Sequence, residues 1–241
     1  MTDQGGSELT GRHVLVTGGS KGIGRAVVEA LVEAGAAVHV LARDPSPVAA
    51  LVRGSGGEVW PADLTDDEAV WTALDGLRDR FGGAPWAVVN CAGAFGVAPL
   101  AETSVQLFDR LMSVNLRGSF LVLRALLPDL LERGSGRIVN VGSVAGRRAF
   151  PGNGAYSASK FGLRGLHEVL LEEIRGTGVS ATLLEPAATD TPLWDPLDPD
   201  HDPNLPARAA MLQAADVARG VIFVLTRPDE VAIPLLQIER G

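Results

Sequence analysis

The sequence contains a single cysteine, Cys91, among 241 residues. One cysteine excludes an intramolecular disulfide and a cysteine cluster for zinc, and a free cysteine is usually a small buried hydrophobic side chain. Basic residues are also few, because 21 Lys and Arg stand against 29 Asp and Glu, a formal net charge of −8. An acidic surface argues against nucleic acid or an anionic membrane as a partner.

Long apolar runs and a secretory signal are missing as well. No uninterrupted apolar run approaches the ~20 residues that a membrane-spanning helix needs. The first residues, MTDQGGSELTGR, lack the charged and then apolar pattern of a signal peptide. The chain does have 46% hydrophobic residues, enough for a large core. We therefore expect a soluble cytoplasmic protein with one domain over residues 1–241.

Short apolar segments alternate with amphipathic ones along the whole chain. This alternation predicts a parallel sheet of about seven strands with helices on both faces, a doubly wound, Rossmann-like α/β fold. The predicted strands are 13–17, 37–42, 58–60, 86–89, 137–141, 179–184 and 231–238. The predicted helices are 25–34, 67–80, 103–133 (unbroken, or broken near Pro128), 154–175 and 214–225. Residues 192–206, with five prolines and four aspartates, fit neither pattern, which predicts a substrate lid at about 190–213.

A glycine-rich turn, GGSKGIG from Gly18 to Gly24, lies between the first predicted strand and helix. Glycines at such a turn allow a tight bend, let a pyrophosphate approach the backbone and let the helix pack closely on the strand. The helix N-terminus would offer free N–H groups to phosphates. The spacing is GxxxGxG rather than GxGxxG, so the prediction of a dinucleotide site depends on the position between strand and helix.

The end of the second predicted strand bears on the choice of nucleotide. An acidic residue there would hold a ribose 2′-hydroxyl and favour NAD. Ala42 and Arg43 stand there instead, and Lys21 in the glycine turn can approach the same group. Two cations near one 2′-phosphate favour NADP.

The same turn also fits GxSxG, the nucleophile elbow of α/β-hydrolases, with Ser20 as the nucleophile. This alternative needs an acid and then a histidine further along the chain. Structural roles are more common for His39, in mid-strand, and His167, in mid-helix, whereas His201 stays open as a candidate. We rank a serine hydrolase below the dinucleotide site, because the turn follows the first strand rather than a later, central one.

Tyr156 and Lys160 lie four residues apart near the start of the predicted helix 154–175, which places both on one helix face. A nearby ammonium favours the phenolate, and we expect it to lower the tyrosine pKa from about 10. Such a phenol can give a proton to a carbonyl oxygen or take one from an alcohol. Ser143 follows the strand 137–141 at the edge where open α/β sheets bind ligands.

These segments resemble the short-chain dehydrogenase/reductase family over about residues 11–240. The resemblance rests on motifs in the family's order and approximate spacing: Thr17 to Gly24, Asp63-Leu64, Asn90 to Gly93, Asn115, Ser143, and YSASK at 156–160. It implies a carbonyl reductase of the single-domain, NADP-preferring type that interconverts a carbonyl compound and its alcohol. A non-catalytic NADP-binding sensor or scaffold is the alternative on the same fold, ranked low because all four catalytic positions are kept.

The resemblance implies a catalytic set of four residues. Tyr156 would be the general acid/base, and Lys160 would lower its pKa and hold the nicotinamide ribose. Ser143 would hydrogen-bond the substrate oxygen. Asn115 would hold a water that links Lys160 to solvent. An unpaired buried amide costs ~1–3 kcal/mol, so we expect Asn115 to have partners.

The resemblance also implies an NADP(H) site. Asp63 would meet the adenine, Asn90, Ala92 and Gly93 would line the adenosine, and Pro186 to Thr191 would contact the nicotinamide. The implied nucleotide-binding residues are Gly18, Ser20, Lys21, Gly22, Ile23, Gly24, Arg43, Asp63, Leu64, Asn90, Ala92, Gly93, Tyr156, Lys160, Pro186, Thr189 and Thr191. Because members are commonly tetramers or dimers, we also expect a homo-oligomer packed through the helices at 103–133 and 154–175.

Three residues depart from the family pattern. Cys91 stands where asparagine is usual, Ala187 where glycine usually follows the proline, and Thr189 where an aliphatic residue is usual. The last two bear on how the nicotinamide is seated. The tail 231–238 lacks the common Gly-Gly ending and is similar to a subset that includes reductases and dehydrogenases of short hydroxy acids.

The physiological substrate is not readable from the sequence. An apolar pocket is expected from Phe95, Phe150, Leu193, Trp194 and Met211. Arg147 and Arg148 follow Ser143 closely, so they either meet a substrate carboxylate or acyl-carrier phosphate or lie in an exposed loop.

Overall fold

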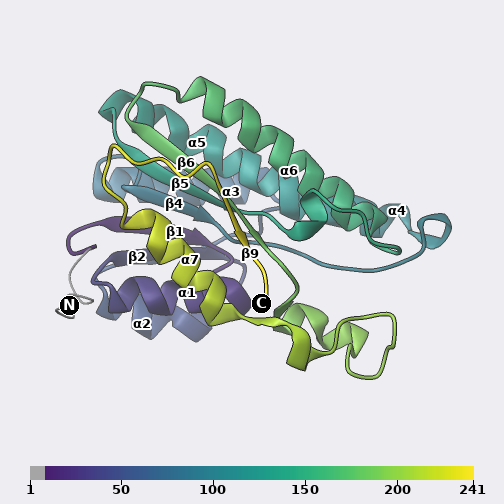
Figure 1. The fold of residues 1–241 in the computed structure, drawn as a ribbon. Helices are drawn as coiled ribbons and strands as arrows, with labels where there is room; N and C mark the ends of the chain where they lie inside the picture. Colours follow the sequence, from purple (N-terminus) through teal and green to yellow (C-terminus); the bar gives the residue numbers. More distant parts are fainter. Residues whose placement is uncertain (1–8) are drawn as a thin grey trace.

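A seven-stranded parallel sheet forms the centre of the computed structural model, which describes residues 9–241 (Figure 1). The strands follow the order β3-β2-β1-β4-β5-β6-β9, and all neighbours pair in parallel. Their bounds are β1 His13–Thr17, β2 Ala37–Ala42, β3 Val59–Pro61, β4 Ala87–Asn90, β5 Gly136–Val141, β6 Val179–Pro186 and β9 Leu235–Ile238. The predicted fold class is confirmed. The expectations about residues 1–8 lie outside the described residues.

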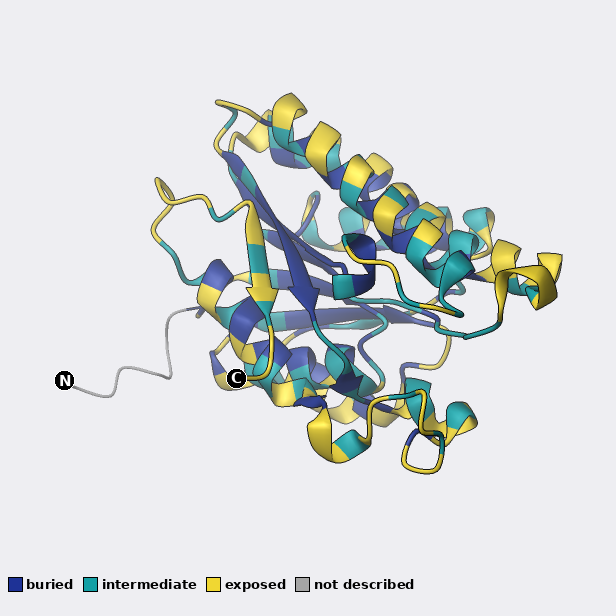
Figure 2. Cartoon of the chain, turned by 45° about the vertical axis from the view of Figure 1, so that its right-hand side comes forward, coloured by how far each residue is buried: buried dark blue, intermediate teal, exposed yellow. Residues whose placement is uncertain are grey.

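Two helical layers cover the sheet, one on each face (Figure 1). The first consists of α1 Gly22–Glu33, α2 Ala49–Gly54 and α7 Ala214–Leu225. The second consists of α3 Asp67–Phe81, α4 Val105–Met112, α5 Gly118–Arg133 and α6 Gly154–Glu173. The central strands are buried on both faces because each is a nearly continuous apolar run, as parallel sheets require (Figure 2).

Two helices end at residue types that commonly cap helices. Asp66 caps α3 by accepting a hydrogen bond from the Ala69 N–H at 3.1 Å. Gly82 ends the same helix with a left-handed φ of 72°, and Gly35 follows α1 with φ 87°. Helix α6 presents buried, intermediate and exposed stripes along its length in Figure 2, as an amphipathic helix on a sheet should.

The predicted helix 103–133 forms one helical run, Val105–Arg133, which does not break at Pro128. A π-helical turn, η3 Ser113–Arg117, separates α4 from α5. Pro128 stays inside α5 on an exposed position, where the carbonyl that loses its N–H partner can bind water. The break near Pro128 was therefore the wrong alternative. Instead, the wider π turn at 113–117 places Asn115 in the interior.

The run Val105–Arg133 bears on the expectation that no apolar segment is long enough to span a membrane. By length and composition alone it could cross a membrane, with a mean hydropathy of 1.2 in its most apolar window, and among residues 9–241 it is the only helix that could. Half of that window is buried against the rest of the chain. Core helices share this property, so the run carries no argument for a membrane.

The segment after β6 contains regular structure that the sequence did not predict. Short parallel strands β7 Thr189–Asp190 and β8 Leu212–Gln213 pair at its two ends. Between them lie two 3-10 helices, η5 Pro192–Leu197 and η6 Arg208–Ala210. The expectation of no helix over 192–206 is wrong for η5, because Pro192 at its first turn has the fixed φ that a helix start needs. In Figure 1 this segment projects beyond the sheet as a separate light-green excursion.

Candidate active site

The glycine turn forms a narrow junction at the carboxyl ends of β1 and β4. Gly18 has φ 67°, and a Cβ there would lie 2.6 Å from Ala92 Cα. A Cβ on Gly24 would lie 2.3 Å from the Gly18 carbonyl oxygen. Because no side chain fits at either position, the start of α1 lies directly against the turn. The Thr17 hydroxyl closes the junction by accepting hydrogen bonds from the Cys91 and Ala92 N–H groups at 3.1 and 3.2 Å.

The N-terminus of α1 fits a phosphate group. Lys21 is its N-cap residue and makes no side-chain capping bond, so its side chain leaves the first N–H groups unbonded. Ser20, Gly22 and Ile23 border the same end and are partly exposed. Gly22 has φ 53° and faces Thr191, whose Cβ would lie 3.2 Å from a Cβ on the glycine. The turn therefore has the shape and the donors that a dinucleotide phosphate needs.

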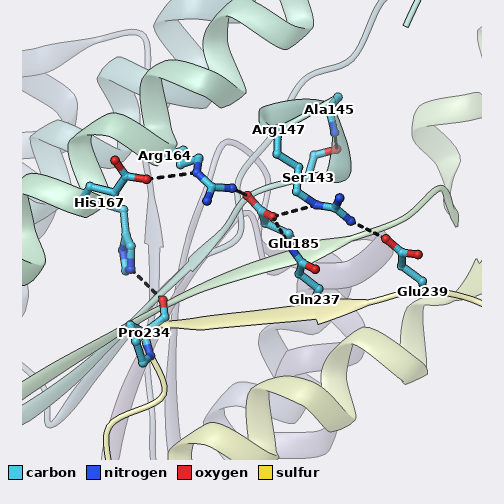
Figure 3. A network of polar contacts seen from close by, with 10 residues as sticks. Ser143, Ala145, Arg147, Arg164, His167, Glu185, Pro234, Gln237 and Glu239 are labelled. Atoms are coloured by element: carbon cyan, nitrogen blue, oxygen red, sulfur yellow. Dashed lines mark hydrogen bonds and ion pairs between the residues drawn. The ribbon is translucent and has the colours of Figure 1, made fainter. Parts of the chain in front are cut away.

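Asn90 ends a chain of buried polar groups. Its Nδ2 donates to Asn140 Oδ1 at 2.9 Å, and Asn140 Nδ2 contacts His167 Nδ1 at 3.1 Å. His167 Nε2 lies 3.1 Å from the Pro234 carbonyl oxygen, which can only accept, so this nitrogen carries the proton (Figure 3). Asn90 Oδ1 is then left as a buried acceptor that no described residue satisfies. A ligand hydroxyl at this strand end would fill that need.

The two basic residues that favour NADP are both exposed. Lys21 lies at the start of α1, and Arg43 lies just after β2 with its Nη1 4.0 Å from Asp63 Oδ2. The other Asp63 oxygen, Oδ1, accepts from the Thr65 N–H and hydroxyl at 2.9 Å. Leu64 is buried and packs on Gly118 of α5, which anchors this loop. Arg43 is thus held only weakly and stays free to meet an anionic group.

Tyr156 and Lys160 lie together on the first turns of α6, as predicted. The Lys160 side chain is buried, its Nζ lies 5.9 Å from the centre of the Tyr156 ring, and it donates to the Val141 carbonyl oxygen at 3.0 Å. Burial lowers the pKa of Lys160 to about 8. Burial also raises the pKa of the Cys91 thiol to about 12, which leaves that thiol protonated at neutral pH.

The expected lowering of the Tyr156 pKa is not found in the protein alone. Burial raises the pKa of this phenol, and hydrogen bonding to Ser143 opposes the rise. Desolvation of the phenolate outweighs the attraction of an ammonium that is itself buried and turned toward a backbone carbonyl. The lysine effect proposed from the sequence is therefore not the dominant influence on the phenol in this state.

Asn115 is completely buried and has the partners that were expected. Its Oδ1 accepts from the Ala94 N–H at 2.7 Å, and its Nδ2 donates to the Ala94 carbonyl and to Ser159 Oγ at 3.0 and 2.9 Å. Gly93 leaves room for this amide, since a Cβ there would lie 3.6 Å from its Oδ1. The side chain thus joins the loop after β4 to helix α6. It has no donor left for a water.

Ser143 lies at the start of the short 3-10 helix η4 Val144–Gly146, and its Oγ accepts from the Ala145 N–H at 3.1 Å. The hydroxyl itself hydrogen-bonds Tyr156, which favours the phenolate. Arg147, just after η4, forms ion pairs with Glu185 and Glu239. Arg148 is exposed and stacks on Phe150 at 5.4 Å. The structure therefore removes Arg147, but not Arg148, from the residues that could meet an anionic substrate.

Aromatic rings connect the segment after β6 to the candidate catalytic tyrosine. Phe95 packs edge-on against Tyr156, and Trp194 packs against Phe95, each with ring centres 4.8 Å apart. Trp194 Nε1 donates to the Thr189 carbonyl at 3.1 Å. Leu193 is partly exposed nearby in the sequence, whereas Met211 is almost completely buried and belongs to the core.

The expected nicotinamide-contacting residues run from the end of β6 through β7. Pro186 ends β6, and Thr189 and Thr191 are both buried. The Thr189 hydroxyl donates to the Ala187 carbonyl at 2.9 Å, so the two departures from the family pattern contact each other. Arg208 holds this segment by pairing with Asp190 and with Asp195, the latter at 2.6 Å.

The histidines do not support the hydrolase alternative. His39 Nε2 contacts His13 Nδ1 at 2.9 Å, and His39 Nδ1 accepts from the Glu58 N–H at 3.2 Å. Both His167 nitrogens are occupied by Asn140 and Pro234. His201 is exposed and pairs with Asp198. Ser20 therefore has no histidine bonded to it among residues 9–241.

Glu185 is a residue that sequence reasoning missed. It is buried at the end of β6 and pairs with arginines from two other segments (Figure 3). A carboxylate directly after the apolar pair Leu183-Leu184 was a visible signal, because acidic residues are rarely buried without partners.

Comparison with known proteins agrees with this geometry. Residues 12–202 match the family model described as short chain dehydrogenase. The chain is 36% identical over 190 residues to 2,5-dichloro-2,5-cyclohexadiene-1,4-diol dehydrogenase of Sphingobium indicum, covering 78% of this chain and 76% of the relative. It is 34% identical over 240 residues to glycine betaine reductase ATRR of Emericella nidulans, covering 96% of this chain but only 19% of that much longer protein.

Solved structures give the same result. A metagenomic short-chain oxidoreductase in complex with NADP aligns with a TM-score of 0.80 and 30% identity, covering 98% of this chain and 99% of that one. A structure described as ribose-5-phosphate isomerase from Brucella melitensis 16M aligns with a TM-score of 0.88 and 30% identity, covering 98% and 93%. The chain belongs to the short-chain dehydrogenase family, whose members are oxidoreductases that bind a nicotinamide cofactor. Activities differ among the relatives, so the family does not fix the substrate.

Proposed function

We propose that the protein is an NADP(H)-dependent oxidoreductase that interconverts a carbonyl compound and its alcohol. The observation that carries the proposal is the placement of Tyr156, Lys160 and Ser143 together at the carboxyl edge of the sheet that also bears the glycine turn. A proton donor beside a dinucleotide site is what carbonyl reduction needs.

The bound nucleotide would supply a hydride to the carbonyl carbon. Tyr156 would donate its phenolic proton to the carbonyl oxygen, and a raised pKa keeps that proton in place at neutral pH. The Ser143 hydroxyl, which hydrogen-bonds Tyr156 in the protein alone, would donate a hydrogen bond to the same oxygen. Lys160 would hold the ribose and replace the proton on the phenol. Asn115 would keep the loop after β4 fixed against α6.

A preference for NADP is supported by Lys21 and Arg43. Both are exposed at the edge where a 2′-phosphate would lie, and the weak contact of Arg43 with Asp63 leaves its guanidinium available. The complex of a related structure with NADP agrees with this choice. In a cell the NADP pool is mostly reduced, which favours reduction as the direction.

The substrate pocket is proposed to be apolar on one side. Phe95 and Trp194 form an aromatic wall next to Tyr156, and the segment 190–213 would act as the lid that carries Trp194. Acidic residues in that segment disfavour highly anionic substrates. A cytoplasmic location is proposed as well, since the acidic chain has one cysteine and would draw on a reduced nucleotide pool; cell fractionation tests it.

A homo-oligomer is supported by apolar side chains on the outer side of the second helical layer. Exposed hydrophobic residues gather on its helices, namely Val105, Phe108, Phe120, Phe161 and Val169. Monomers rarely leave several large apolar side chains exposed on one layer.

The test is a panel of carbonyl compounds with NADPH or NADH, followed by loss of cofactor absorbance. We expect turnover with NADPH at a higher kcat/KM than with NADH, and loss of that preference in the double variant Lys21→Ala, Arg43→Ala. Tyr156→Phe should lower kcat by ~10²–10⁴-fold while NADPH binding stays within about twofold. A wild type that prefers NADH would refute the NADP assignment.

The same panel separates the alternatives. NADPH binding without turnover of any carbonyl or alcohol would favour the sensor or scaffold. Ester hydrolysis that is lost in Ser20→Ala would favour the hydrolase.

A further inference from the structure

A buried carboxylate lies where several segments of the candidate active site meet (Figure 3). Glu185 directly precedes Pro186, and its side chain is 1% exposed. Its Oε1 accepts from Arg164 Nη1 at 2.9 Å, and its Oε2 lies 3.2 Å from Arg147 Nε. Gln237 of β9 donates to Oε2 at 3.3 Å. These partners satisfy a charge that would otherwise be strongly disfavoured in the interior.

Arg164 brings the catalytic helix to this carboxylate. It follows Lys160 by four residues and Tyr156 by eight on α6, so the three side chains share one helix face. Its Nε also pairs with Glu168, one turn further along, at 3.1 Å. The guanidinium is therefore held between α6 and the end of β6.

Arg147 brings the serine loop to the same carboxylate. It follows Ser143 by four residues, at the end of η4. This loop packs tightly on α6, since a Cβ on Gly146 would lie 2.9 Å from the Lys160 carbonyl oxygen. The place of Ser143 relative to α6 is thus set by backbone packing on one side and by the Arg147–Glu185 pair on the other.

We propose that Glu185, acting through Arg147, is a positioning residue that fixes the Ser143 hydroxyl opposite Tyr156. The inference rests on the proposed oxidoreductase function, because it assigns a further role within the same site. Glu239 also pairs with the Arg147 guanidinium, so two carboxylates hold this side chain. Neither Glu185 nor Arg147 bonds to a residue of the glycine turn, so nucleotide affinity should not depend on them.

Loss of the Arg147–Glu185 ion pair is expected to change the pKa of Tyr156. Hydrogen bonding to Ser143 lowers the pKa of Tyr156 against the effect of burial. A shifted serine loop would weaken that hydrogen bond, and the phenol would then titrate at higher pH. A purely structural role would lower thermal stability without moving this titration.

Tyr156 is the only tyrosine in the chain, so phenolate absorbance in the ultraviolet reports its ionisation alone. We expect Arg147→Met and Ser143→Ala each to raise the titration midpoint by about half a pH unit or more. Arg148→Met is the matched control, because that neighbouring arginine is exposed and forms no ion pair with Glu185. The Tyr156 titration midpoint of this variant should equal the wild-type value. Circular dichroism at each pH confirms that the chain stays folded. An unchanged midpoint in folded Arg147→Met would overturn the proposal.

A double-mutant cycle on turnover tests the same idea by a second route. Arg147→Met should lower kcat about tenfold in the wild type but less than about twofold in Ser143→Ala, because the arginine acts through the serine. NADPH affinity should stay within about twofold in all variants. Effects that multiply in the double variant would show that Arg147 acts independently of Ser143 and would overturn the proposal. Absence of wild-type turnover would instead refute the proposed function, and the titration would then decide the positioning role.

Discussion

At neutral pH the Lys160 ammonium lies buried near the Tyr156 ring and donates to the Val141 carbonyl oxygen. Burial lowers its pKa from 10.5 to about 8. At 1.36 kcal/mol per pKa unit, holding this charge costs the folded chain roughly 3 kcal/mol. The hydrogen bond to Val141 returns about 1 kcal/mol. The lysine is thus kept at the expense of stability, as residues at functional sites often are.

We therefore expect Lys160→Met to raise the free energy of unfolding of the nucleotide-free protein by about 2 kcal/mol at pH 7 while abolishing turnover. Urea denaturation measures the first effect and the carbonyl panel the second. A variant that is less stable than the wild type would contradict the account.

The pH dependence of this gain has a definite sign. Below pH ~8 the lysine is protonated in both the folded and the unfolded chain, so the full cost is present in the wild type. Between pH ~8 and ~10.4 the folded chain loses the proton first, and wild-type stability rises relative to Lys160→Met. The advantage of the variant should therefore shrink over this window.

At the residue scale, the sequence predicted which side chains lie together, but not the direction of the Tyr156 pKa shift. The four-residue spacing of Tyr156 and Lys160 fixed their common helix face. The direction of the Tyr156 pKa depends on burial and on Ser143, which only the folded chain shows. Glu185 was missed for a similar reason, because its partners come from α6, η4 and β9 and no local spacing links them.

Among the structural elements, the glycine turn is the one whose geometry restricts the residue type most. Gly18 combines a left-handed φ of 67° with a Cβ position 2.6 Å from Ala92 Cα. Gly11 has a similar φ of 75° but open space around it. A comparison of the two separates backbone strain from steric clash.

We expect Gly11→Ala to lower the free energy of unfolding by ~1–2 kcal/mol, the usual penalty of a left-handed residue with a side chain. Gly18→Ala should lower it further, because the clash with Ala92 in the loop after β4 adds to that strain, and should weaken NADPH binding by about tenfold or more. Denaturation and fluorescence titration with NADPH measure the two effects. Equal losses in both variants would show that the contact with Ala92 is unimportant.

The helix 103–133 contains a feature that could not be predicted from the sequence. The sequence predicted one helix here, unbroken or broken near Pro128. The irregularity in this helix is instead the π turn 113–117, where Asn115 bonds to Ala94 and Ser159. Such tertiary contacts leave no local mark in the sequence.

For the whole molecule, the exposed apolar side chains of the second helical layer predict self-association. Val169 on α6 is 55% exposed, far more than a core-facing valine would be. We expect Val169→Glu to shift the protein toward monomer in size-exclusion chromatography with light scattering, because a buried unpaired charge opposes packing. Leu51→Glu on α2, in the opposite helical layer, is the control and should leave the mass unchanged. A monomeric wild type would refute the prediction.

The segment between β7 and β8 contacts two parts of the candidate active site, the glycine turn and the aromatic rings beside Tyr156. Thr191 lies against Gly22 of the glycine turn, and Trp194 packs on Phe95 beside Tyr156. We expect a dinucleotide that binds at the glycine turn to displace Thr191, and Trp194 with it, because the Trp194 backbone N–H donates to the Thr191 carbonyl at 3.1 Å. Catalysis should then follow a compulsory order, with the dinucleotide arriving first and departing last. Product-inhibition kinetics would reveal this as competition between the oxidised and reduced dinucleotides, with the alcohol inhibiting noncompetitively against the reduced form.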